Sequence, residues 1–228
     1  MEYLPLAVML AASLMLASLH AIGRSRRRKR LAGFAFRFGL EYSPVDLFAL
    51  IDHNFDLFNM ADGARCRNVV WGTWQGVPVK VAELRFAPSL EARRERQRGK
   101  LEQYSFAYAE VPAWLPHLAI RREPLGGLAD DLGLHHIRLE WEAFNREFRV
   151  VCEDRQFAYA FLDVSMMQWL MDVAGDSPFR FETRGGRLLV SCPRLGPDGL
   201  IPLFAVAQGF HDHVPRMILR EYATNVQS

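Results

Sequence analysis

The chain has 228 residues, of which half are hydrophobic and 24% are charged, and its formal net charge is +2. This length allows one domain of roughly 200 residues beside an N-terminal segment. Six basic residues lie between positions 24 and 30, so the rest of the chain is mildly acidic. A nucleic-acid-binding domain carries its basic surface on the domain itself, and we therefore exclude nucleic acid as a partner.

The three cysteines are Cys66, Cys152 and Cys192. They are odd in number and widely spaced, and no Cys-x-x-Cys motif occurs. This pattern argues against a disulfide framework or a zinc cluster and favours free thiols in a reducing compartment.

The run from Tyr3 to Ile22 contains no formally charged residue. As a helix, about twenty residues span about 30 Å, which is the thickness of the hydrocarbon core of a bilayer. A cleaved signal peptide would carry basic residues before the run, whereas Glu2 precedes it here. A buried core helix would show a clear polar face, which this run lacks. We predict that residues 1–30 form a retained transmembrane anchor with its juxtamembrane segment.

A basic cluster follows this run directly. Basic residues after a span mark its cytoplasmic side, and each adds about 1 kcal/mol of attraction to an anionic leaflet. We therefore predict an N-terminus outside the cell and a cytoplasmic domain over residues 31–228. The residues predicted to contact anionic lipids at the membrane surface are Arg24, Arg26, Arg27, Arg28, Lys29 and Arg30.

Short elements are predicted in the first half of the domain. The segment Leu31–Gly39 is expected to be a connector or an edge element. Ser43 and Pro44 are typical of a capped helix start, which predicts a helix over Val45–Ile51. Residues His53–Gly63 are expected to form a loop.

A β-hairpin is predicted next, with strands Asn68–Thr73 and Val77–Phe86 around a turn that contains Gly76. The mixed charges of Pro88–Gln103 indicate a solvated loop or a short exposed helix, and a docking surface is the alternative. Further strands are expected at Tyr104–Val111 and Leu118–Ile120, and a short helix at Leu125–Leu132.

The stretch from Ile137 to Val173 builds the predicted core. Apolar and polar residues alternate over Ile137–Trp141 and Phe148–Cys152, which is the period of half-buried strands. Asp154 is expected to cap the turn Gln156–Phe161, and Asp163 the helix Val164–Val173. The methionines of this helix are more typical of core filling than of a binding groove.

The C-terminal part predicts a hairpin and a helix. Strands over Phe179–Thr183 and Arg187–Cys192 flank the sequence Arg-Gly-Gly at 184–186, which suits a tight turn. The last helix is expected over Leu200–Val214, and Pro215 is expected to end it.

Several of these segments resemble a bacterial family of membrane-anchored proteins that contain a domain of unknown function. The similar segments are Glu142–Asp154, the run Met-Met-Gln-Trp-Leu at 166–170, Arg67–Val70 with Gly72, and Val214–Arg216. The likeness covers most of residues 40–218. It implies the same architecture, an N-terminal hydrophobic helix before a mixed domain, and it supplies no catalytic residues.

Motifs of known chemistry are absent from the sequence. His211 and His213 come nearest to a metal site, but residues two apart on a helix face different directions. No phosphate-binding loop, nucleophile elbow or His-Glu-x-x-His motif occurs. The acidic residues between Glu140 and Asp154 lie on strands, which carry acids routinely. We therefore predict no catalytic, cofactor-binding or metal-binding residues.

The predicted fold is α+β, with an antiparallel sheet, in one or two parts, packed against the Met-rich and C-terminal helices and preceded by one transmembrane helix. The predicted function is a non-catalytic, membrane-tethered domain that binds or scaffolds a lipid or protein partner. The alternative is an enzyme that acts at the membrane surface. A deep pocket with perturbed pKa values would favour the enzyme, whereas an exposed apolar patch would favour the binding domain.

Overall fold

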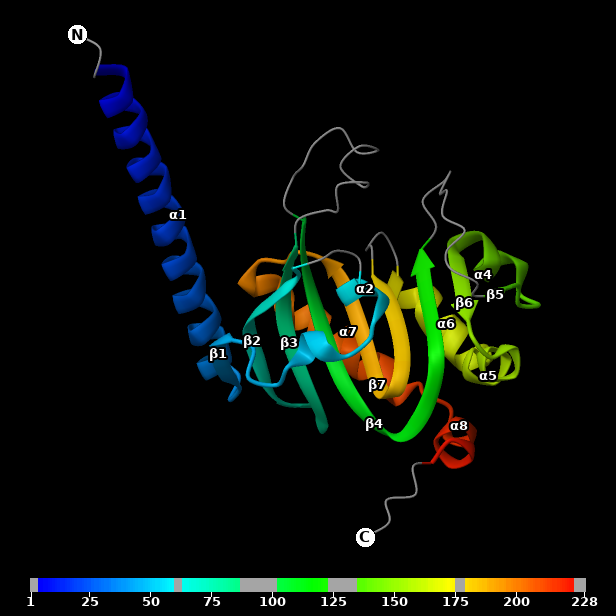
Figure 1. Cartoon of the computed structure of the whole chain (residues 1–228). Helices are drawn as coiled ribbons and strands as arrows, with labels where there is room; N and C mark the ends of the chain where they lie inside the picture. The colour runs from blue at the N-terminus through cyan, green and yellow to red at the C-terminus, as the bar shows by residue number, and fades with distance from the viewer. Residues whose placement is uncertain (1–3, 60–62, 87–101, 123–134, 175–178, 224–228) are drawn as a thin grey trace.

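The computed structural model describes residues 4–59, 63–86, 102–122, 135–174 and 179–223. For residues 4–14, 16, 20, 102, 135, 136 and 174 it describes the backbone only. The fold is α+β, as predicted: one antiparallel sheet packs with helices (Figure 1). The predicted charged segment Pro88–Gln103 lies almost entirely outside the described residues, and the predicted helix Leu125–Leu132 lies wholly outside them.

The sheet has seven strands in the order β1-β2-β3-β4-β6-β5, with β7 pairing on β4. All of the pairings are antiparallel. The strands are β1 (Glu41–Val45), β2 (Arg65–Trp74), β3 (Val77–Phe86), β4 (Glu102–Arg122), β5 (His135–Ile137), β6 (Phe148–Cys152) and β7 (Arg180–Pro193).

The central strand is β4, which curves through the molecule (Figure 1). Its first half pairs with β3 and its second half with β6, while β7 follows it along both halves. The two strands predicted at Tyr104–Val111 and Leu118–Ile120 are parts of this one strand. The prolines between them, Pro112 and Pro116, lie where the pairing with β7 shifts register, because proline is tolerated in a sheet at bulges.

The prediction of a hairpin over residues 179–192 is wrong. That segment is the continuous strand β7. Gly185 has a φ of +58°, which a glycine adopts readily, but it serves a bulge and not a turn. The bulge bends β7 so that it keeps its pairing with the curved β4.

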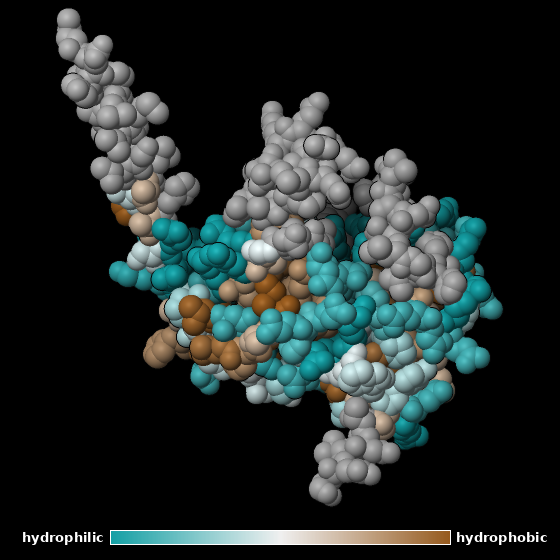
Figure 2. All heavy atoms as spheres, viewed as in Figure 1, coloured by the Kyte–Doolittle hydropathy of each residue, from teal (hydrophilic) through white to brown (hydrophobic). Residues whose placement is uncertain are grey.

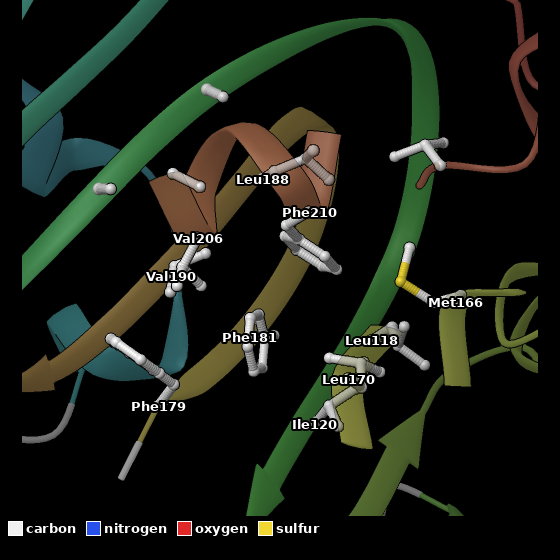
Figure 3. Packing of buried hydrophobic residues seen from close by; sticks show 14 of the residues in the cluster. Leu118, Ile120, Met166, Leu170, Phe179, Phe181, Leu188, Val190, Val206 and Phe210 are labelled. Carbon is white, nitrogen blue, oxygen red and sulfur yellow. The ribbon is translucent and has the colours of Figure 1, made fainter. Parts of the chain in front are cut away.

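Helices α6 (Val164–Ala174) and α7 (Leu200–Asp212) cover one face of the sheet. Figure 3 shows Phe181 of β7 and Phe210 of α7 facing each other, and their ring centroids are 5.1 Å apart. Met166 and Leu170 pack into the same cluster, so the methionines of α6 fill core as predicted. Two short helices, α5 (Arg155–Phe161) and α8 (Arg216–Glu221), lie beside this core.

The opposite face of the sheet carries a second apolar cluster. Phe106 and Tyr108 of β4 lie on this face, and the short helices η1 (Leu50–Asp52) and α2 (Asp56–Asn59) cover it. The alternation of side chains along a strand sends neighbouring residues to opposite faces. Since both faces are covered, the middle of the sheet is buried on both sides.

Helix α1 (Leu4–Arg37) is longer than predicted. The prediction of a connector or edge element at Leu31–Gly39 is wrong, because the helix continues to Arg37. Leu31, Phe34 and Ala35 have helical spacing and are buried, and Phe34 stacks on Phe204 of α7. The C-terminal end of α1 is therefore part of the domain core, while its N-terminal part projects away from the sheet (Figure 1).

Among the residues that the structure describes in full, no helix is long and apolar enough to cross a membrane. Most side chains of the apolar run Tyr3–Ile22 lie outside those residues. The projecting part of α1 is built from this run, with its backbone described from Leu4 onwards.

Two smaller predictions need correction. Ser43 and Pro44 lie in the edge strand β1 and do not start a helix. The carboxylate of Asp46 accepts the amide hydrogens of Phe48 and Leu50 instead, just before η1. The strand predicted at Ile137–Trp141 corresponds to β5, which is shorter and already ends at Ile137, and helix α4 (Glu142–Glu147) comes after it.

Other local predictions are confirmed. Asp154 accepts from the amides of Gln156 and Phe157 at the start of α5, and Asp163 accepts from the amide of Met166 at the start of α6. The hairpin of β2 and β3 turns at Gln75 and Gly76, both of which have positive φ, as in a type I′ turn.

Candidate functional site: an arginine pocket beside helix α1

A cavity of about 280 Å³ lies between α1 and the strands β2 and β3. We call it the arginine pocket, because six of its lining residues are arginines. Its lining is Leu19, Gly23, Arg24, Arg27, Arg28, Arg67, Asn68, Glu83, Arg85 and Arg194.

The helical wall of the pocket follows from the spacing of α1. Leu19, Gly23 and Arg27 are four residues apart, as are Arg24 and Arg28, so all five lie near one face of the helix. A Cβ atom added at Gly23 would meet no heavy atom within 4 Å. Glycine therefore leaves open space in this wall.

The sheet wall is organised around Glu83, which is 5% exposed. Its carboxylate accepts hydrogen bonds from Nε of Arg27 and from Nδ2 of Asn68, the latter at 2.9 Å. Nε of Arg194 lies 3.8 Å from the same carboxylate. Arg27 also donates to the carbonyl oxygen of Leu195, at 2.6 Å. One buried carboxylate thus fixes α1 to the sheet.

A bulge in β2 places Asn68 in this network. The register between β2 and β3 shifts between Arg67 and Val70, and Asn68 has a φ of +55°. Its amide bridges Glu83 and the hydroxyl of Tyr42, which donates to Oδ1 at 2.9 Å. Bulges commonly redirect side chains next to binding sites.

Cations outnumber carboxylates in this pocket. Among its described lining residues Glu83 is the one acid, against six arginines. Nε of Arg85 is buried without a hydrogen-bond partner. Burial lowers the pKa of Arg194, and the neighbouring Arg27 and Arg85 lower it further, while Glu83 opposes them. The pocket therefore favours an anion.

The six predicted surface cations divide into two groups. Arg24, Arg27 and Arg28 line the pocket, and Arg27 is held inward by Glu83. The other three do not line it. Arg30 pairs with Asp198 at 2.8 Å, where both side chains are largely exposed, and Arg26 and Lys29 are exposed on α1.

Three arginines of the pocket were not predicted as site residues: Arg67, Arg85 and Arg194. Part of the signal was present, because Glu83 and Arg85 are two apart on one face of a predicted strand. Arg67 lies just outside the predicted strand Asn68–Thr73, and it comes opposite Glu83 only through the bulge in β2. The contribution of Arg194 and the approach of α1 depend on contacts between segments that are 56 to 168 residues apart, which no local pattern encodes.

A second cluster of charged residues lies elsewhere on the sheet. We call Asp56, His117 and Glu182 the His117 cluster; each offers a ligand atom, and these atoms lie within 4.8 Å of one another. Arg121 donates to Oδ2 of Asp56 at 2.6 Å, and Glu182 accepts the amide hydrogen of Asp56 at 2.9 Å. The carboxylates are thus held by groups of the chain itself.

Burial sets the protonation of this cluster. It raises the pKa of Glu182 to about 7, and the nearby Asp56 adds to this effect. It lowers the pKa of His117, against the attraction of Asp56. Neither ring nitrogen of His117 has a hydrogen-bond partner within the described chain, although Nε2 lies 3.4 Å from Oδ1 of Asp56.

His211 and His213, which were not predicted to bind a metal, have separate surroundings in the structure. His211 lies in the last turn of α7 beside Asp212. His213 follows the helix, where it contacts the carbonyl oxygen of Gly209 and stacks on Trp169.

No family model and no curated protein matches this chain. A solved structure is similar: the crystal structure of the mycobacterial trehalose monomycolate transport factor A, TtfA. The TM-score is 0.58 at 13% sequence identity, and the match covers 85% of this chain and 97% of the other. At this identity the likeness shows a shared fold.

Proposed function

We propose that this protein is a single-pass membrane protein whose α1 anchors a non-catalytic α+β domain at the inner face of the membrane, where the domain binds or scaffolds a lipid or protein partner. The observation that carries the proposal is α1 itself. One continuous helix begins in the uncharged run, passes through the basic cluster and ends in the domain core.

The geometry of α1 supports this anchor. Its apolar part projects from the domain (Figure 1), and an uncharged run of that length matches a bilayer core. The basic residues follow the run, and that order favours a cytoplasmic domain. The resemblance to membrane-anchored proteins with a domain of unknown function agrees with this arrangement, as does the shared fold with a transport factor.

A surface for a protein partner is also available on the domain. Most of the surface seen in Figure 2 is hydrophilic, and apolar residues gather near β1 and the segment after it. Val45 and Leu47 are 55% and 62% exposed there. Exposed apolar groups of this kind are typical of interaction sites.

Membrane fractionation tests the anchor. The full chain should stay in the membrane pellet after a wash at alkaline pH, which strips proteins held by charge alone. A variant with Leu10→Arg and Leu14→Arg should be lost to the supernatant, because charges within a span are costly. Wild-type protein released by the wash would contradict the proposal.

The second candidate function, an enzyme at the membrane surface, draws on the His117 cluster. A buried carboxylate with a pKa near 7 beside a neutral histidine is typical of acid–base sites. His117 and Glu182 are only 2% and 4% exposed, however, so a substrate has no open path to them. Lipid mass spectrometry can compare membranes that contain wild type with membranes that contain His117→Gln. A lipid product formed by wild type alone would establish the enzyme.

A further inference from the structure

We infer that the arginine pocket binds the phosphate-bearing headgroup of one anionic phospholipid of the inner leaflet. The inference rests on the proposed anchoring, and it deepens that function by naming a ligand class and a site. It replaces a diffuse attraction of six cations to the leaflet with a shaped cavity that combines half of them with three arginines of the domain.

The residues of the pocket fit a phosphate group. Guanidinium groups bind phosphate oxygens with paired hydrogen bonds, and they do so best where water is partly excluded. Arg27 and Glu83 already hold the two walls together. No ion pair within the described chain engages Arg24, Arg28 or Arg67, so their charges stay available to a ligand.

The position of the pocket selects a lipid over a soluble phosphate. Leu19 belongs to the predicted span, and Gly23 follows its last residue, Ile22. The helical wall therefore crosses the boundary between hydrocarbon and headgroups. In addition, β3 ends near the pocket, at the end of the sheet toward which α1 projects (Figure 1). A headgroup at this level can enter sideways while its acyl chains stay beside α1.

The volume agrees with this ligand class. A cavity of about 280 Å³ is close to the lower limit of the range for small-molecule sites. It accommodates a phosphate with a small substituent and leaves the acyl chains outside.

The experiment compares lipid retention by the full chain. Protein purified in a zwitterionic detergent is mixed with equal amounts of phosphatidylglycerol and phosphatidylcholine, and native mass spectrometry counts the lipid that stays bound. We expect one phosphatidylglycerol per chain and no retained phosphatidylcholine. Equal retention of the two lipids would overturn the inference.

Two kinds of variant separate the pocket from general charge. Arg67→Gln with Arg85→Gln should lower the retained phosphatidylglycerol by roughly tenfold or more, which is about 1.4 kcal/mol. Arg26→Gln with Lys29→Gln removes the same charge from exposed positions of α1 and should change retention less than twofold. An equal loss in both pairs would assign the effect to diffuse attraction and overturn the pocket.

A neutral variant tests shape alone. Gly23→Gln places a side chain in the open space of the helical wall without removing any charge, and it should abolish retention. Gly33→Gln, at an exposed glycine of the same helix with equally open surroundings, is the control. Unchanged lipid retention in Gly23→Gln would overturn the pocket. Because this substitution lies in α1 and leaves the sheet intact, it still tests the pocket if the double arginine variant misfolds.

A competition arm distinguishes the source of the phosphate. Excess inorganic phosphate or glycerol phosphate should not displace the lipid; displacement would assign the pocket to a soluble phosphate compound. The wash-resistance assay keeps the two proposals apart. Pocket variants should remain in the membrane pellet, whereas wild type that leaves the pellet yet retains phosphatidylglycerol in micelles would refute the anchor and keep the pocket.

Discussion

The arginine pocket and the His117 cluster lie on the same sheet, but they differ in how their charges are balanced. In the His117 cluster, Arg121 and a backbone amide hold the two carboxylates, and both His117 and Glu182 are closed to solvent. In the arginine pocket, one buried carboxylate faces six arginines around an open cavity.

We interpret this difference as that between a structural cluster and a binding site. Buried ionic groups that find their partners within the chain need no ligand, and they act on stability and its pH dependence. Cations gathered in excess around a cavity repel one another until an anion enters. Substitutions in the two regions should therefore change the free energy of unfolding by different amounts, and they follow from the largest expected change to the smallest. All of them apply to the full chain in a zwitterionic detergent without anionic lipid.

The largest effect is expected for Glu83→Gln. The substitution removes the carboxylate that holds Arg27 and Asn68 and lies near Arg194, and it leaves buried cations without a counter-charge. We expect the free energy of unfolding to fall by about 3 kcal/mol, with a decrease in Tm of about 6–12 °C. Thermal unfolding followed by circular dichroism measures it.

The control for Glu83→Gln is Glu110→Gln. Glu110 pairs with Lys80 at 2.9 Å, but its side chain is 63% exposed. Such a pair contributes roughly 0–1 kcal/mol. An equal decrease in Tm in the two variants would contradict the conclusion that Glu83 fixes α1 to the sheet.

In the other region, Glu182→Gln should change the pH dependence of stability. The pKa of Glu182 is about 7 in the folded protein and lies near 4.5 without burial, so the unfolded chain loses this proton first as the pH rises. Its ionisation therefore lowers the stability of wild type between about pH 4.5 and pH 7. At pH 8 the difference of the two pKa values amounts to about 3 kcal/mol, and replacing a fitted buried carboxyl by an amide costs about 1 kcal/mol. The variant should therefore be more stable than wild type by roughly 2 kcal/mol at this pH.

The free energy of unfolding of Glu182→Gln and of wild type is measured by denaturation at several pH values. The difference between the two proteins at each pH isolates the contribution of Glu182. His117 titrates in the opposite sense, because its lowered pKa makes stability fall at acidic pH, but it is present in both proteins. A difference that stays constant from pH 5 to pH 8 would show that Glu182 ionises normally. The control is Glu142→Gln, a substitution at an exposed acid, whose stability should depend on pH in the same way as that of wild type.

Neighbouring residues of α1 provide a smaller contrast. Arg27→Gln should cost about 1–2 kcal/mol, because its side chain is 16% exposed and bonds both Glu83 and the carbonyl of Leu195. Arg26→Gln, one position away and exposed, should change stability by less than about 0.5 kcal/mol. Thermal scans of both variants compare them, and similar values would mean that α1 is not held at this point.

The smallest effect is expected for Arg30→Gln. Its partner Asp198 is 79% exposed and the arginine itself 62%, so salt and water screen the pair. We expect a change within about 0.5 kcal/mol in the same thermal scans. A larger loss would indicate that the whole basic cluster, and not Arg27 alone, fastens α1 to the domain.

Local patterns in the sequence predicted the parts of this fold that local physics determines. The hairpin of β2 and β3, the caps Asp154 and Asp163, and helix α7 follow from turn chemistry, side-chain acceptors and helical periodicity. The class of fold follows from these elements.

Predictions failed where distant contacts override local signals. Prolines in β4 and glycines in β7 suggest breaks, but the two strands bend together and stay paired. Leu31 and Phe34 look like part of a connector until the sheet and α7 cover them. The pocket is the extreme case, because α1, the β2–β3 hairpin and Arg194 meet only in the folded chain.

Sidedness is the property on which the proposed function depends most. The native cysteines are poor probes of it, because Cys152 and Cys192 are buried and Cys66 is half-buried. Burial also raises their thiol pKa values, to about 11 for Cys152 and about 12 for Cys192. Introduced cysteines avoid this problem. Ser165 is exposed on α6 and nearly isosteric with cysteine, and Glu2 precedes the apolar run.

The deciding measurement labels Glu2→Cys and Ser165→Cys with a membrane-impermeant maleimide, in intact and in permeabilised cells, with wild type as the background. We expect Glu2→Cys to react in intact cells and Ser165→Cys to react only after permeabilisation. Labelling of Ser165→Cys in intact cells at the permeabilised level would place the domain outside, and the anchor topology and the inner-leaflet ligand of the arginine pocket would both be refuted.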